Sequence, residues 1–204
     1  MLTFDHIALS CEGLETGAAD VAAALGQEML PGGHHPAMGT HNRLLSMGPG
    51  EYSELVAIDP EAPAPDRPRW FDLDAFSGAT RITNWICRCD DLDSALALAP
   101  DGAGVPIALT RGDLSWTMAV PEDGKLPFAG LFPAMIQWQR AAHPAERLAD
   151  TGLRLAALRL ISPDAAALSA ALAPLITDDR IAVLEGPSAR IEADLDTPKG
   201  RVTL

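Results

Sequence analysis

Two polar side chains are notable because each interrupts an apolar segment of the chain. His6 lies in FDHIALS, and Glu54 lies in YSELVAID. Both segments are typical of β-strands, in which alternate side chains point to the same face. An imidazole is a common ligand for divalent metals. A carboxylate such as Glu54 is costly to bury unless a metal ion, an arginine or a hydrogen-bond donor meets it.

The segment around His6 is repeated later in the chain. Residues 4–19 read FDHIALSCEGLETGAA and residues 82–97 read ITNWICRCDDLDSALA, so Phe4 aligns with Ile82 at a constant offset of 78 residues. Each copy is an apolar run, an acidic turn and an Ala/Leu-rich stretch, which predicts a strand leading into a helix. A fold built from two such copies tends to form its site between them.

Strand alternation predicts which side chains face the cleft between the copies: His6, Ala8 and Ser10 in the first, and Asn84, Ile86 and Arg88 in the second. Asn84 therefore occupies the position equivalent to His6. The segment PAMIQWQR (133–140) matches YSELVAID, with Gln137 at the place of Glu54. Only the first copy offers a histidine and a carboxylate.

Arg88 is predicted to lie on this concave face of an apolar strand, where a guanidinium needs an anion. The carboxylate or phosphate of a ligand would serve, and so would a structural ion pair with Glu54 or an aspartate. Glu54 in turn could form a salt bridge with Arg43 or Arg88 instead of binding a metal.

Glycine, proline and turn residues mark the boundaries of the units that position these residues. We expect an α+β fold of repeated β-α-β-β-β units, with mixed curved sheets and helices on the outer face. A first unit (2–59) is followed by a Pro-rich connector (60–79), a second unit (80–140) and a third, divergent β-α-β-rich unit (150–204).

Bulk composition excludes several classes of partner. Asp and Glu outnumber Lys and Arg by 28 to 15, giving a net charge of −13, which disfavours nucleic acid. No apolar run reaches the ~20 residues of a membrane span, and no signal peptide precedes the first strand. The three cysteines fit buried thiols in a reducing compartment. We therefore expect a cytoplasmic protein without nucleic-acid or membrane partners.

These motifs, in this order, resemble the vicinal oxygen chelate superfamily, which includes glyoxalase I, extradiol dioxygenases and bleomycin-resistance proteins. The resemblance rests on paired units with histidine early in the first strand and glutamate in the last. More narrowly, GGHHPAMGTHNRLLSMG (32–48), YSELVAID and WICRCDDL are similar to the bacterial glyoxalase-like domain group. The similarity covers roughly residues 2–140.

The resemblance implies a divalent metal on the concave face, held by His6 and Glu54. Asn84 and Gln137 depart from a four-ligand pattern, and His41 in GTHNRLL is the expected third ligand. A His-His-Glu set suits Zn²⁺, Ni²⁺, Fe²⁺ or Mn²⁺. Alternatively, His41 only fixes its loop through a backbone hydrogen bond, and we expect His34 and His35 in an exposed loop.

The leading function is then a metal-dependent lyase, isomerase or dioxygenase for a small anionic, vicinal-oxygen substrate. Glu54 or His41 would act as catalytic base, and the substrate-binding residues would be Arg88, Arg43, Asn84 and Gln137. The alternative is a metal-free protein that sequesters a small molecule, in the manner of bleomycin-resistance proteins. A third possibility is a scaffold whose last unit mediates dimerisation. We expect a homodimer with a small-molecule ligand.

Overall fold

The computed structural model describes residues 1–139 and 143–204 of the chain, so the predicted end of the second unit at residue 140 lies outside the described residues. The first unit consists of one helix and four strands, namely β1 (Thr3–Ser10), α1 (Leu14–Leu25), β2 (Leu30–His35), β3 (Thr40–Ser46) and β4 (Tyr52–Ile58). β1 runs parallel to β4, and β2, β3 and β4 form an antiparallel series. The order β-α-β-β-β agrees with the prediction.

The second unit repeats this arrangement with β5 (Arg81–Arg88), α2 (Leu92–Leu96), β6 (Val105–Arg111), β7 (Leu114–Val120) and β8 (Ala134–Trp138). Antiparallel pairing of β1 with β5 joins the two units into one eight-stranded sheet in the order β2-β3-β4-β1-β5-β8-β7-β6. Ile7 pairs with Trp85, its own counterpart at the offset of 78 residues. The repeat in the sequence is therefore a pseudo-twofold relation centred on that pair.

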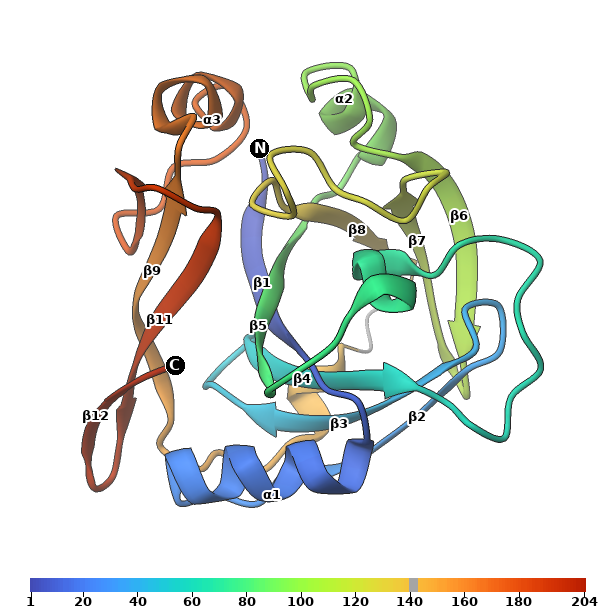
Figure 1. The fold of residues 1–204 in the computed structure, drawn as a ribbon, viewed down its shortest axis with the longest axis vertical. Coiled ribbons are helices and arrows are strands. Elements are labelled where there is room, and N and C mark those ends of the chain that lie inside the picture. The colour runs from blue at the N-terminus through green and yellow to red at the C-terminus, as the bar shows by residue number, and fades with distance from the viewer. Residues whose placement is uncertain (140–142) are drawn as a thin grey trace.

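This sheet curves into a half-barrel, and the connector between the units passes through its hollow (Figure 1). The short 3₁₀ helix η1 (Trp70–Ala75) places Trp70 and Phe71 in an apolar cluster with Ala8, Ile86 and Ile136 of the concave face. Phe71 and Asp72 both have positive φ, 62° and 52°, which is uncommon for residues other than glycine. The Pro-rich connector is thus ordered, and its η1 segment fills the cleft with Trp70 and Phe71.

The third segment forms a second sheet from β9 (Arg154–Ser162), α3 (Ala165–Leu172), β10 (Ile181–Glu185), β11 (Arg190–Thr197) and β12 (Gly200–Thr203). The strand order is β10-β9-β11-β12, and η2 (Pro144–Arg147) precedes β9. Here the first strand pairs in parallel with the strand directly after the helix, whereas β1 and β5 pair with the last strands of their units. The topology of this segment therefore differs from that of the first two units.

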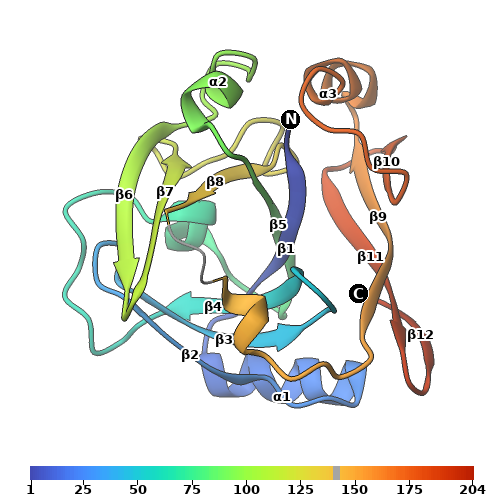
Figure 2. The same cartoon turned by 180° about the vertical axis from the view of Figure 1, so that it is seen from behind.

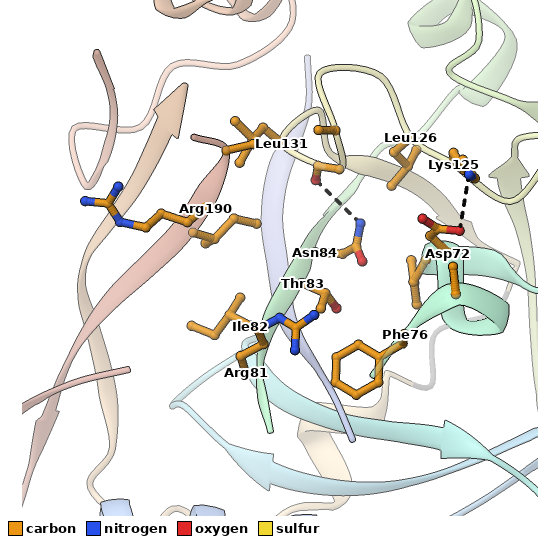
Figure 3. A pocket seen from close by; sticks show the side chains of 16 residues that line it. Asp72, Phe76, Arg81, Ile82, Thr83, Asn84, Lys125, Leu126, Leu131 and Arg190 are labelled. Carbon is orange, nitrogen blue, oxygen red and sulfur yellow. Dashed lines mark hydrogen bonds and ion pairs between the residues drawn. The ribbon is translucent and has the colours of Figure 1, made fainter. Parts of the chain in front are cut away.

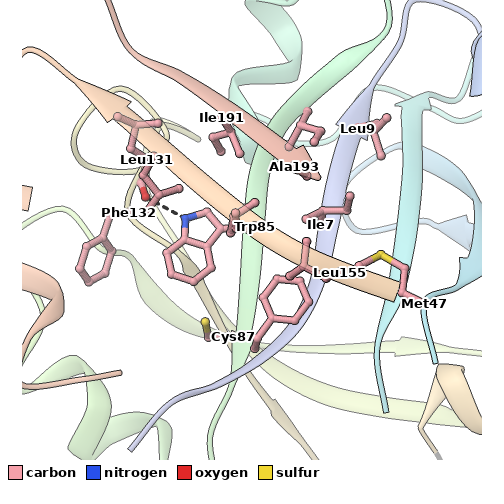
Figure 4. Packing of buried hydrophobic residues seen from close by; sticks show 14 of the residues in the cluster. Ile7, Leu9, Met47, Trp85, Cys87, Leu131, Phe132, Leu155, Ile191 and Ala193 are labelled. Carbon is pink, nitrogen blue, oxygen red and sulfur yellow. Dashed lines mark hydrogen bonds between the residues drawn. The ribbon is translucent and has the colours of Figure 1, made fainter. Parts of the chain in front are cut away.

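The second sheet covers the back of β1 and β5 (Figures 1 and 2). Ile7 and Trp85 point away from the cleft, and they lie in one buried cluster with Leu155 and Ile191 of the second sheet (Figure 4). The helices α1 and α2 cover other parts of the outer face, over β3 and β4 and over β7 and β8. The α+β fold with mixed, curved sheets is confirmed. Among the described residues, none of the helices has the length and apolar character that crossing a membrane requires.

Candidate functional site

The concave face of the large sheet encloses a small cavity of about 30 Å³. Its polar lining is His6, His35, Tyr52, Glu54 and Arg111, and its walls are Trp70, Phe71, Trp116, Met118, Ile136 and Trp138. A cavity of this size holds about one water molecule. The polar groups come from both halves of the sheet, because Arg111 ends β6 and the other four lie in the first unit.

His6 and Glu54 face each other in this cavity. Nε2 of His6 lies 3.5 Å from Oε2 of Glu54, and the amide of Asn42 donates to Oε1 of the same carboxylate. Burial alone would raise the pKa of Glu54, but the hydrogen bond and charge of His6, with His35 and Asn42, lower it to about 2. Burial disfavours the charged form of His6, yet Asp5 and Glu54 together raise the pKa of this imidazole. The two groups therefore form a buried ion pair.

Asp5 completes the arrangement from the side of His6 opposite Glu54. The β1–β5 register shifts between Phe4 and His6, so Asp5 is an extra residue in the strand. Such a bulge re-aims side chains, and here it brings Oδ1 of Asp5 within 2.7 Å of Nδ1 of His6. Because that contact occupies Nδ1, Nε2 is directed to Glu54. We did not predict a role for Asp5, although a second charged residue beside His6 in an apolar strand was a visible signal.

The other carboxylate oxygen of Asp5 is also fully used. Oδ2 accepts hydrogen bonds from Trp138 Nε1 at 3.1 Å and His143 Nε2 at 3.0 Å, and lies 3.4 Å from the guanidinium of Arg88. Burial opposes ionisation, but His143 and His6 hold the pKa of Asp5 well below its usual range. The ring of His6 stacks on Tyr52 with centroids 4.2 Å apart. The imidazole is therefore fixed on three sides.

His35 lies in the cavity, so its predicted place in an exposed loop is wrong. It ends the edge strand β2 and is 4% exposed. Its Nε2 accepts a hydrogen bond from Arg111 at 3.1 Å, since a guanidinium can only donate, and Nδ1 therefore donates to Thr40 Oγ1. Burial lowers the pKa of His35 to about 4, so the ring is neutral at physiological pH.

Arg111 itself was missing from the predicted site. It is half-buried, and among the described residues its hydrogen-bond partner is His35, with no carboxylate at ion-pairing distance. It also lines a neighbouring groove of about 540 Å³, together with residues of β2 and η2. Arg111 reaches His35 because β6 and β2, the two edge strands of the curved sheet, approach each other. No local sequence pattern reveals such a contact.

His41 does not join His6 and Glu54. In the antiparallel β3–β4 pair, Leu44 lies opposite Glu54 and His41 opposite Ala57, so alternation turns His41 to the other face. Asn42 occupies the position beside Glu54 that we assigned to His41. His41 instead groups with His34 and Asp59.

The two predicted arginine contacts to Glu54 are absent from the described residues. Arg43 lies on the same outer face as His41, where its Nη2 donates to both oxygens of Glu15 in α1, at 2.6 and 2.8 Å. Arg88 donates to the carbonyls of Phe4 and Gly50 and reaches Asp5. Alternation along β3 turns Arg43 away from Glu54. The guanidinium of Arg88 is occupied by two backbone carbonyls and by Asp5 of the bulge.

The predicted substrate-binding residues of the second unit lie outside the small cavity. Asn84 faces the cleft, but it lines a separate pocket of about 440 Å³ next to β11 (Figure 3). Its Oδ1 is buried without a partner among the described residues. Phe71 lines both spaces and separates them.

Gln137 lies on the opposite face of β8. Its Oε1 accepts from the backbone N–H of Leu92 and its Nε2 donates to the carbonyl of Asp90, so it caps α2. Ala134 is the true counterpart of Glu54, since it pairs with Ile86 as Glu54 pairs with Ala8. The predicted alignment was therefore displaced by an odd number of residues, which exchanges the two faces of a strand. Ile136 and Trp138 are the residues of β8 that line the cavity.

The interior residues do not fit the three-ligand metal set that we expected. The 3.5 Å between His6 and Glu54 is close to the ~3.3 Å that separates two ligands of one tetrahedral ion, and Asp5 would orient the imidazole. However, the second half contributes Ile86, Ala134 and Ile136 to the concave cluster, and Nε2 of His35 is engaged by Arg111. Two ligands are fewer than the three that catalytic zinc sites or non-haem iron sites use.

A solved structure that covers most of this chain agrees with the fold. A hypothetical protein from Staphylococcus aureus has a TM-score of 0.63 at 14% identity, covering 93% of this chain and 88% of that one. Methylmalonyl-CoA epimerase from Mycobacterium tuberculosis gives 0.43 at 18% identity, over 68% of this chain and 88% of that one. A variant of the Streptomyces coelicolor epimerase in complex with 2-nitronate-propionyl-CoA gives 0.44 at 17%, over 70% and 100%.

No curated relative matches the chain. The family model described as "Glyoxalase-like domain" matches residues 4–176, which include both β-α-β-β-β units and continue into the third segment. This match spans well over half of the sequence. The protein therefore belongs to the glyoxalase-like domain family.

Proposed function

We propose that the protein binds a small anionic molecule with neighbouring oxygen atoms inside the curved sheet and moves a proton on it, as an isomerase or lyase. The observation that carries this proposal is the buried chain of Asp5, His6 and Glu54, in which one imidazole lies between two carboxylates. Titratable groups with strongly shifted pKa values are concentrated in active sites, because burial and charged partners set the values that catalysis needs.

Substrate binding would change the basicity of Glu54. In the free protein its pKa of about 2, set largely by His6, makes it a weak base. A substrate carbonyl oxygen competes with Glu54 for the Nε2 hydrogen of His6. Once His6 donates to the substrate, the burial of Glu54 is less well compensated and its pKa rises. The binding step itself therefore prepares the base.

The chemistry that this pair supports is enolisation next to a carbonyl group. Glu54 takes a proton from the adjacent carbon, the C–H electron pair forms the new C=C bond, and His6 donates its Nε2 proton to the carbonyl oxygen. Return of the proton to the neighbouring carbon gives an isomer, and departure of a leaving group gives a lyase product. Asp5 stabilises the imidazolium and fixes its orientation.

Arg111 and Trp70 supply unused hydrogen-bond donors for an anionic substrate. Arg111 lines both the 540 Å³ groove and the cavity. The indole N–H of Trp70, which also lines the cavity, is buried without an acceptor among the described residues. A substrate carboxylate would satisfy both. This assigns to Arg111 the role that we predicted for Arg88.

Entry of a substrate requires the connector to move, because a cavity of about 30 Å³ holds no organic molecule. Trp70 and Phe71 of η1 are the side chains that fill the hollow, and the positive φ angles of Phe71 and Asp72 cost energy in the closed form. Displacement of this segment would join the cavity to the pocket beside Asn84.

Metal-free sequestration of a small molecule is the second candidate. The apolar character of Ile86, Ala134 and Ile136 on the second half favours it, because these residues hold a ligand without reacting with it. Both functions involve a small-molecule ligand, and we retain the homodimer as an expectation that light scattering on the purified protein would test.

Proton exchange in D₂O separates the two candidates. The purified protein would be incubated with α-ketoaldehydes and short 2-oxo acids, and loss of C–H signals followed by proton NMR. We expect exchange with at least one compound, and Glu54→Gln should abolish this exchange while leaving binding measurable. Binding without exchange in the unmodified protein would support sequestration, and absence of both for the whole panel would contradict the proposed substrate class.

A further inference from the structure

A second group of metal-binding side chains lies on the opposite face of the sheet from His6 and Glu54. His34 of β2 and His41 of β3 are directly opposite each other in the antiparallel pair. Asp59 follows the last residue of β4 and is anchored beside this pair, since its N–H donates to the carbonyl of Gly39. One ligand atom from each of the three residues lies within 4.8 Å of the others.

The carboxylate of this group is held in place before any ion binds. Asp59 is 5% exposed, its Oδ1 accepts from the backbone N–H of Glu61 at 3.0 Å, and its Oδ2 lies 2.6 Å from Nδ1 of His34. The backbone N–H of Glu61 lies outside the proposed ligand set, and such outer partners commonly set the orientation of metal ligands.

The two imidazoles leave the group open to solvent. The side chain of His34 is 68% exposed and His41 is half-buried, so an ion has a path to the site and water can complete its coordination. The ligands of one Zn²⁺ ion are ~3–4 Å apart, and the freedom of the exposed His34 ring allows the small adjustment from the present spacing.

We propose that His34, His41 and Asp59 bind one divalent transition-metal ion, with Zn²⁺ as the reference ion. Two nitrogen ligands and one carboxylate are a donor set that suits Zn²⁺, Ni²⁺ and Co²⁺ over Mg²⁺ or Ca²⁺. The site is separate from the interior proton-transfer site and does not depend on the function proposed for it.

Such an ion would join the edge strand β2 to β3 and to the end of β4. His35 is the next residue of β2 and carries the contact to Arg111 on the opposite face. Because neighbouring residues of a strand share a rigid backbone, an ion on His34 would also fix the strand that bears His35. We therefore assign a structural role to the metal.

Zinc titration of protein stripped with a chelator tests the site. The chain should carry no polyhistidine tag, which would bind zinc itself, and calorimetry should give one Zn²⁺ per chain. His41→Ala and His34→Ala should each weaken binding at least tenfold, whereas the interior variants His6→Ala and Glu54→Gln should bind zinc as the unmodified protein does. Co²⁺ should give visible ligand-field bands that disappear in the His41→Ala protein.

The outcomes are distinct. No zinc binding by the unmodified chain would overturn the proposal, as would zinc binding that survives both the His34 and His41 substitutions. Loss of zinc in the His6→Ala protein with retention in His41→Ala would place the ion in the interior instead. Because His34 is exposed, its alanine variant should fold, and circular dichroism would verify that a lost signal reports the ligand.

Discussion

Oδ1 of Asp5 lies 2.7 Å from Nδ1 of His6, and both residues are buried in the concave face of the sheet. The contact determines which nitrogen of His6 faces Glu54. It also keeps a charged imidazole in an apolar interior, because a carboxylate lies on either side of the ring.

Replacement of Asp5 by Asn should therefore destabilise the protein strongly. The substitution removes a charge that His6, His143 and Arg88 all face, and breaking a buried ion pair from one side costs about 3–5 kcal/mol. Urea unfolding would measure the loss. A matched change at an exposed pair, Asp196→Asn opposite Arg201, should alter stability far less, because water already solvates both charges. Equal effects of the two substitutions would contradict the role given to Asp5.

Stability should depend on pH in two windows. Glu54 has a pKa lowered to about 2, so its stabilisation is complete above its ordinary value of 4.5 and is lost as the pH falls toward 2. His6 has a raised pKa, so its contribution is complete below 6.5 and is lost as the pH rises through the value in the folded protein. We expect maximal stability at pH 4.5–6.5, measured by urea unfolding across the pH range.

The same measurement on Glu54→Gln provides the control. Its acid limb should become shallower, and the alkaline limb should move to lower pH because His6 loses one of the two carboxylates that raise its pKa. An unchanged alkaline limb would show that the two groups are not coupled.

Arg111→Gln should weaken binding of an anionic ligand by about tenfold to a hundredfold, because a charge-assisted hydrogen bond to the ligand is lost. The free protein should keep most of its stability, since the partner of Arg111 among the described residues is the neutral ring of His35. Calorimetric titration with any compound that passes the exchange assay would check this. Arg43→Gln, on the outer face, should leave the affinity unaltered.

Asp72→Gly should stabilise the protein slightly. Asp72 is half-buried and has a φ of 52°. Glycine adopts this conformation without the cost of a side chain, a gain of up to about 1 kcal/mol less the entropy that glycine adds to the unfolded chain. The weak 3.7 Å pair with Lys125 adds little. Thermal unfolding would show the change, and Asp72→Ala, which keeps the strain, should show no gain.

The position of a site residue could be predicted where it depends on one strand alone, and could not where it depends on how that strand pairs with another. The faces of His6, Ile7 and Trp85 follow from alternation along a single strand, and these predictions are confirmed. The charge of Asp5 beside His6 was visible in the sequence, but its partners depend on a bulge in the pairing with β5, which the sequence of one strand does not reveal. The prediction for Gln137 fails for a similar reason, because a shift by an odd number of residues moves a side chain to the other face of a strand.

His35 and Arg111 meet because β2 and β6 approach at the open ends of the sheet. That contact joins residues 76 positions apart and depends on the curvature of the whole sheet. The repeat predicted that the sheet is curved, whereas the contact between its two edge strands depends on the degree of that curvature and was not predictable. The position of Trp70 and Phe71 in the hollow likewise depends on the path of the connector. Its proline content predicted a stiff segment, but not where in the fold that segment would lie.

The packing of the second sheet on β1 and β5 has a consequence for how the chain can be divided. Ile7, Leu9, Trp85 and Cys87 form a continuous apolar surface that Leu155, Ile191 and Ala193 shield from water (Figure 4). A fragment ending before residue 150 would carry the whole interior site yet expose this surface, and exposed apolar patches of that kind promote aggregation. We therefore expect the two repeats alone to aggregate, and the third segment to be needed for a soluble product.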